Sequence, residues 1–147
     1  MGCFITAHTA AKHPELKAAV TAAPCDVGEG MMSEKGREQM KAIFETAAPW
    51  LSGTSAEALY EEAERNKEWY HLSSLAEKLA KIPMLCINAK LDEECSGDVH
   101  TEPWVSAVQA AGGDIIWEEW ETDHSFSDMR YDLIEKVATF LVKQVEK

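Results

Sequence analysis

Residues 83–92 read PMLCINAKLD, and this stretch decides the fold. A short, nearly continuous apolar run between a proline and a charged tip is typical of a strand buried on both faces. The run ends at Asp92, so an acidic side chain follows the predicted strand closely. One helix and one strand later, residues 122–127 read TDHSFS and place His124 on a loop. By this spacing a carboxylate can reach and orient an imidazole.

The rest of the chain divides into alternating helices and strands. Apolar spacing marks the elements, and prolines, glycines and capping serines mark their ends. Together they predict the order helix 1–13, strand 16–23, helices 33–47, 55–70 and 74–81, strand 84–89, a helix from 101 to the glycines at 112–113, strand 114–120 and helix 127–144.

This order predicts an α/β fold with a three-stranded parallel sheet flanked by helices. Strands that are separated by helices pair in parallel through right-handed crossovers. We expect one domain over residues 1–147, with residues 28–82 as a helical, lid-like insertion and the glycines at 28 and 30 as its flexible lead-in. Parallel strands end at the same side of a sheet, which we call the rim, so Asp92 and His124 are expected to meet there.

The charge of the chain limits its partners. It has 26 acidic and 14 basic residues, and its formal net charge is −12. Such a field repels nucleic acid and anionic membranes, so we expect neither as a partner. No apolar window approaches the length of a membrane span, and no basic stretch precedes an apolar one as in a secretory signal. A cytoplasmic protein with a small substrate is therefore expected.

The four cysteines, at positions 3, 25, 86 and 95, are irregularly spaced and include no Cys-x-x-Cys pair. This spacing predicts neither a metal site nor any other cofactor, and it is consistent with a reducing compartment. Cys3 and Cys86 lie in apolar stretches and are expected in the core. The first six residues also match an N-myristoylation pattern, but their continuation into an apolar helix favours a structural role.

Three segments resemble, in the same order, the C-terminal half of the α/β-hydrolase superfamily. Residues 1–20, MGCFITAHTAAKHPELKAAV, resemble the segment after the nucleophile elbow Gly-x-Ser-x-Gly. Residues 82–92 resemble the strand and turn that carry the catalytic acid, and residues 122–128 resemble the histidine loop. The most similar branches are the peptidase-like and dienelactone-hydrolase-like serine hydrolases, which cleave esters, amides or short peptides.

The resemblance implies that Asp92 orients His124, and that His124 is the general base. It places the nucleophilic serine immediately before Met1, so that Met1 takes the position of an oxyanion donor and Gly2 that of the last elbow glycine. The chain is then expected to be a fragment that keeps the acid and the histidine, lacks the nucleophile and is inactive alone.

Substitutes for two of these roles remain open. Cys25 follows the first predicted strand and Cys95 lies in the loop after Asp92, so either thiol is a candidate replacement for the serine. Glu93 and Asp98 compete with Asp92 for the role of orienting acid.

The apolar strand at residues 16–23 lies at the edge of the expected sheet, and an apolar edge invites pairing with another chain. We therefore expect self-association through this edge, or pairing with a chain that supplies the other half of the fold. Two further interpretations stay open: one half of a split enzyme, and a non-catalytic binding or assembly module.

Overall fold

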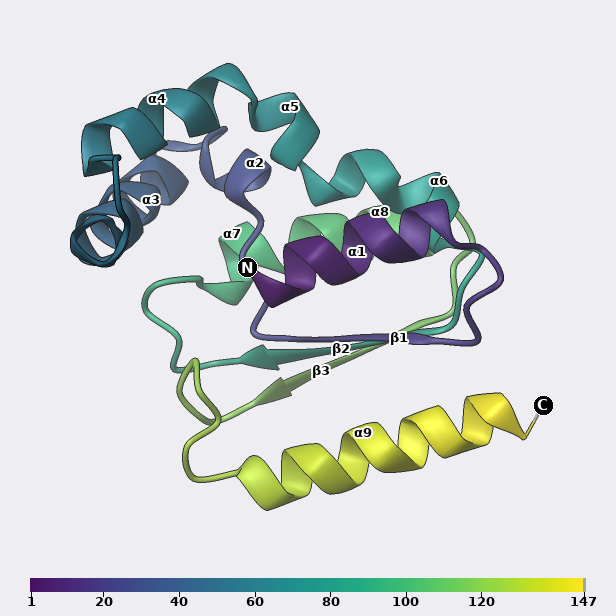
Figure 1. Ribbon diagram of the computed structural model, residues 1–147. Helices are drawn as coiled ribbons and strands as arrows, with labels where there is room; N and C mark the ends of the chain where they lie inside the picture. Colours follow the sequence, from purple (N-terminus) through teal and green to yellow (C-terminus); the bar gives the residue numbers. More distant parts are fainter. Residues whose placement is uncertain (147) are drawn as a thin grey trace.

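Three parallel strands in the order β1-β2-β3 form the sheet, with β1(Ala19–Ala22), β2(Met84–Ala89) and β3(Ile115–Trp120) (Figure 1). The computed structural model describes residues 1–146. The register pairs Ala22 with Ile87 and Ala89 with Trp120, so the strands run in step to a common rim. The α/β class and the three-stranded parallel sheet are thereby confirmed.

Helices connect and cover these strands. They are α1(Gly2–Lys12), α2(Val27–Gly30), α3(Glu34–Ala47), η1(Ala48–Trp50), α4(Ala56–Arg65), α5(Lys67–Tyr70), η2(Leu72–Leu75), α6(Ala76–Leu79), α7(Gly97–His100), α8(Glu102–Ala110) and α9(Arg130–Val145). Ser33 and Ser55 cap α3 and α4, each accepting from a backbone N–H of the first turn at 3.0 and 3.1 Å. Among the described residues, no helix has the length and apolar character needed to cross a membrane.

Several predicted elements need correction. The helix expected over 55–70 is divided at Asn66, which caps α4 outside helical geometry. The residues expected to be a flexible lead-in form α2, because the Asp26 carboxylate accepts the Glu29 N–H at 3.0 Å and starts a helical turn. Helix α1 is buried on one face only: Ala7 is fully buried, whereas Ile5 is 56% exposed.

The core lies on both faces of β2, whose six residues are all buried. Met84 and Cys86 pack toward α1, α6 and α8, while Leu85 and Ile87 pack in a cluster with Phe140 of α9. Figure 1 shows α9 beneath the sheet and the other helices above it. This burial on two faces explains why the strand sequence is apolar without alternation.

The leucine at the centre of β2 tests this packing. Leu85→Ala should lower the free energy of unfolding by about 2–5 kcal/mol, because it deletes a fully buried side chain and leaves a cavity. Leu51→Ala is the matched control, since Leu51 is 47% exposed and should cost well under half as much. Urea unfolding followed by circular dichroism measures both; equal losses would contradict the assignment of β2 to the core.

Candidate functional site

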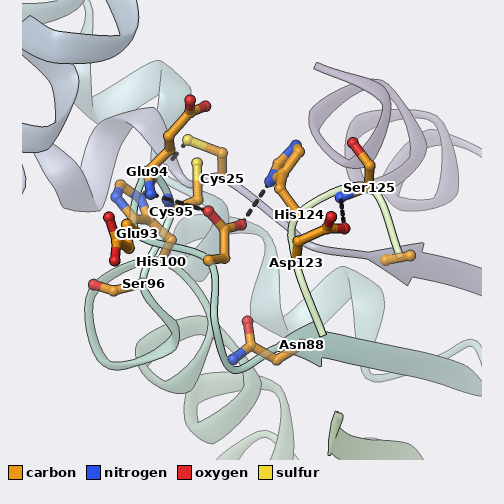
Figure 2. A network of polar contacts seen from close by, with 12 residues as sticks. Cys25, Asn88, Glu93, Glu94, Cys95, Ser96, His100, Asp123, His124 and Ser125 are labelled. Carbon is orange, nitrogen blue, oxygen red and sulfur yellow. Dashed lines mark hydrogen bonds and ion pairs between the residues drawn. The ribbon is translucent and has the colours of Figure 1, made fainter. Parts of the chain in front are cut away.

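The ends of β2 and β3 bring Asp92 and His124 into direct contact. Two backbone bonds continue the strand pairing into the loops: the Lys90 N–H donates to the Trp120 carbonyl at 2.8 Å and the Leu91 N–H to the Thr122 carbonyl at 3.1 Å. Immediately beyond these bonds, Nδ1 of His124 lies 2.6 Å from Oδ2 of Asp92; Figure 2 marks this contact with a dashed line to His124. The expected meeting of these two side chains at the rim is thus observed.

The carboxylate of Asp92 is buried, and both of its oxygens accept hydrogen bonds. Its side chain is 1% exposed, and Oδ1 accepts the backbone N–H groups of Glu94 and Cys95 at 3.0 and 2.9 Å. Burial acts to raise the pKa of Asp92, but the hydrogen bonds from His124 and from these N–H groups outweigh it, so the pKa lies below its ordinary value. Asp92 is therefore a fixed anion at neutral pH.

The imidazole of His124 has one bonded and one open nitrogen. An ionised carboxylate only accepts hydrogen bonds, so Nδ1 carries the proton that lies between His124 and Asp92. This hydrogen bond raises the pKa of His124 above its ordinary value, although partial burial opposes the shift. The side chain is 50% exposed, which leaves Nε2 free to meet a reacting group.

The loop that carries His124 is braced on both sides. The Asp123 carboxylate accepts the backbone N–H groups of Ser125 and Ser127, both at 3.0 Å. Phe126 holds a left-handed backbone with φ of 52° and buries its ring edge-on against Trp120. A bulky residue takes this conformation only where its surroundings enforce it, so Phe126 anchors the loop.

The competing acids lie elsewhere. Asp98 forms an exposed ion pair with Lys35 at 2.5 Å, and the Glu93 carbonyl accepts the Gln39 side chain at 3.3 Å. Neither carboxylate is among the partners of His124, whose acid is Asp92.

The predicted elbow remnants lie at the start of α1. Met1 is 94% exposed, and Figure 1 shows the N-terminal end of α1 above the rim, at the end of the sheet where the strands finish. A Cβ added at Gly2 would meet no atom within 4 Å, so the space beside this glycine is open.

Beside the Asp92–His124 pair lies a cluster that the cysteine spacing did not predict. Donor atoms of Cys25, Cys95 and His100 all lie within 4.8 Å of one another, and Cys95 forms a second such group with Asp92 and His124 (Figure 2). These two trios are the groups of donors in residues 1–146 that can hold a metal ion. Each trio combines two donors that lie within five residues of each other, Cys95 with His100 or with Asp92, and a third donor from a distant segment. A search for a Cys-x-x-Cys pair does not detect such a combination.

Within the cluster, His100 is fully buried and its Nδ1 donates to the Asp26 carbonyl at 2.9 Å. The same nitrogen lies 4.0 Å from the Cys25 sulfur. The hydrogen bond from Cys95, helped by His100 and opposed by burial, lowers the pKa of Cys25 to about 5. The same contact, together with burial, raises the pKa of Cys95. The contact between the two sulfurs thus favours the anionic form of Cys25 over that of Cys95.

Comparison with known proteins adds no assignment: no protein-family model matches the chain, and no curated protein does.

The hydrogen bond between Asp92 and His124 makes a testable prediction. Asp92→Asn should lower the pKa of His124 toward the ordinary histidine value, because the anion that stabilises the imidazolium is lost. The raised histidine pKa stabilises the folded state only while His124 is protonated. The stability lost in the variant should therefore be greatest at about pH 5–6 and should shrink as the pH rises through the pKa of His124.

The pKa is read from the imidazole resonances of His124 in a proton–carbon NMR titration, and the stability from urea unfolding at each pH. Asp123→Asn is the matched control, since this neighbouring carboxylate bonds the loop backbone and not the imidazole. An unchanged His124 pKa in Asp92→Asn, or an equal shift in both variants, would contradict the pairing.

Proposed function

We propose that the chain is the C-terminal part of a serine α/β-hydrolase that cleaves ester, amide or peptide bonds. The observation that carries this proposal is the 2.6 Å contact between a buried carboxylate and a half-exposed imidazole at the rim of a parallel sheet. Ligands of such sheets bind at the carboxyl ends of the strands, and an acid paired with a histidine there is the orienting part of a catalytic triad.

The geometry supports a defined role for each atom. The Asp92 carboxylate holds His124 with the proton on Nδ1, which leaves the lone pair of Nε2 to accept the proton of a serine hydroxyl as its oxygen attacks the substrate carbonyl. Asp92 stabilises the imidazolium that results. His124 then gives this proton to the departing alcohol or amine, and a water repeats the sequence to release the acid.

The serine lies, in this proposal, on a segment that joins Met1 or on a separate chain. Two observations support that position. The open space beside Gly2 is where the strand before an elbow would pack, and the N-terminal ammonium is near enough to the rim to help lower the pKa of Cys25. The Met1 backbone N–H then becomes an amide that can donate to an oxyanion.

The helices between β1 and β2 are proposed to be the lid over this site. Helices α2, α3 and α4 pack around their own small cluster, which includes Met31, Met40 and Ala63. By contrast, Leu72 and Leu79 belong to the core cluster beneath α1 and α8, so η2 and α6 are part of the fold's upper layer. The lid of the proposal is therefore confined to α2–α5.

A second proposal concerns assembly through β1. Within residues 1–146, β1 pairs only with β2, and its sequence AVTA bears no charge. The other outer strand, β3, carries Glu118 and Glu119, which discourage pairing at its edge. The apolar edge of β1 is therefore proposed to pair with a second copy of the chain or with the chain that supplies the elbow.

The hydrolase proposal predicts the sequence ahead of Met1. Reading the gene upstream in frame should show a strand that ends in Gly-x-Ser, and the longer protein should hydrolyse short p-nitrophenyl esters and react with a fluorophosphonate probe. In that protein His124→Ala should lower kcat by about 10⁶-fold, because the serine loses its base.

The 147-residue chain by itself is the negative control and should not react with the probe. Asp123→Asn, which leaves the Asp92–His124 contact in place, should keep most of the activity of the longer protein. If the upstream sequence holds no serine elbow, or if the longer protein is inactive across a panel of acyl chains, the hydrolase proposal fails.

The proposed association through the edge of β1 is tested on the 147-residue chain. The Ala19 and Ala23 N–H groups donate to β2, so by the alternation of a strand the Ala22 N–H points outward. Ala22→Pro removes this outward donor and should turn an associated species into a monomer, whereas Ala22→Ser keeps the donor and should not. Size-exclusion chromatography with light scattering measures both, and a monomeric wild type at high concentration would contradict pairing with a second copy of the chain.

A further inference from the structure

The sulfur atoms of Cys25 and Cys95 lie side by side at the rim, as Figure 2 shows for the two labelled cysteines. Cys25 follows β1 closely, and Cys95 lies on the loop that links β2 to α7. Because β1 and β2 are parallel neighbours in register, their following loops are held against each other by the sheet. The proximity of the two thiols is thus built into the fold.

The surroundings of Cys25 favour its thiolate, which is the reactive form of a cysteine. The Cys95 sulfur lies within 4.8 Å of the Cys25 sulfur, and Nδ1 of His100 lies 4.0 Å from it. Because the Nδ1 proton of His100 already bonds the Asp26 carbonyl at 2.9 Å, the Cys95 thiol, whose pKa is raised, is the main donor to Cys25. Cys25 is half-buried and is the more exposed residue of the two, since Cys95 is only 3% exposed.

Burial raises the pKa of the other two cysteines, so neither favours its thiolate. The Cys3 thiol donates to the Ala22 carbonyl at 3.1 Å, and burial raises the pKa of Cys3. Cys86 lies at the centre of β2 with no exposure, and burial raises the pKa of Cys86 to about 12. Both are therefore protonated and poorly reactive at neutral pH.

We propose that Cys25 and Cys95 are a reactive thiol pair, which a small-molecule disulfide such as oxidised glutathione converts into an intramolecular disulfide. The Cys25 thiolate attacks one sulfur of the small disulfide, which breaks its S–S bond, forms a mixed disulfide at Cys25 and releases one small thiolate. That thiolate takes the proton of Cys95. The Cys95 sulfur then attacks Cys25, forms the protein disulfide and releases the second small thiolate.

In sum, the two protein sulfurs lose two electrons, and the small disulfide gains them and leaves as one thiol and one thiolate.

Formation of the protein disulfide also affects the Asp92–His124 pair, because the backbone N–H of Cys95 donates to Oδ1 of Asp92 at 2.9 Å. Drawing Cys95 toward Cys25 shifts this N–H and with it the carboxylate that orients His124. The disulfide itself does not depend on hydrolase activity, so the two proposals can fail separately.

The test uses the full chain in its reduced form. After incubation with oxidised glutathione and an acid quench, wild type should lose two hydrogens in mass, and peptide mapping should join the peptides of Cys25 and Cys95. Cys3 and Cys86 should remain open to alkylation after denaturation. The imidazole resonances of His124 should shift on oxidation and return on reduction.

Variants separate the two steps. Cys95→Ser should stop at the mixed disulfide and gain one glutathionyl group on Cys25, because no second thiol resolves it. Cys25→Ser should resist oxidation, since burial raises the pKa of each remaining thiol and keeps it protonated. Cys3→Ser is the matched control and should form the disulfide as wild type does. Circular dichroism verifies that each variant folds. If a variant does not fold, the peptide map of the wild-type protein still shows which cysteines the disulfide joins.

Three outcomes overturn the proposal. The first is a wild-type mixed disulfide that persists, which would show that Cys95 cannot reach Cys25. The second is a disulfide that joins Cys25 to Cys3. The third is a purified protein that retains one equivalent of zinc and resists oxidation until a chelator is added, which would make the cluster a metal site.

Discussion

The parallel pairing of β2 with β3 is the constraint on which the site depends. It makes both strands end at one rim, and two further backbone bonds carry the pairing into the loops beyond. The backbone therefore brings Asp92 and His124 close enough for their short side chains to contact each other. Burial of β2 on both faces fixes this register, because a slip by one residue would exchange the residues that face α8 with those that face α9.

A second consequence of the same rim is that Asp92 shares its loop with Cys95, one of the two neighbouring thiols. The backbone N–H of Cys95 stabilises the Asp92 carboxylate, while its side chain supports the charge on Cys25. The Asp92 carboxylate and a thiol that favours its anionic form thus lie near each other in a chain whose formal net charge is −12. Nearby groups stabilise this arrangement. Hydrogen bonds from backbone N–H groups and imidazoles offset the cost of burying negative charge, and solvent ions screen the charge of the distant surface.

Much of the fold could be predicted because the signals were local. The strand at 84–89 was predicted with its observed bounds, since a proline and a charged tip enclose a fully buried run. The serine caps of α3 and α4 were equally clear. The break at Asn66 and the short helix α2 were missed, because in these places the chain turns to satisfy contacts with other segments, such as the bond from the Leu72 N–H to Asp26 at 3.0 Å.

The sequence by itself determined the alternation of helices and strands, the parallel sheet and the placement of an acid and a histidine at the ends of adjacent strands, because each follows from the order of elements along the chain. Only the tertiary structure decided that Asp92, rather than Glu93 or Asp98, partners His124. It alone brought Cys25, Cys95 and His100 together. The physical reason is that such contacts depend on how loops from separate strands pack at the rim, and no local pattern encodes that packing.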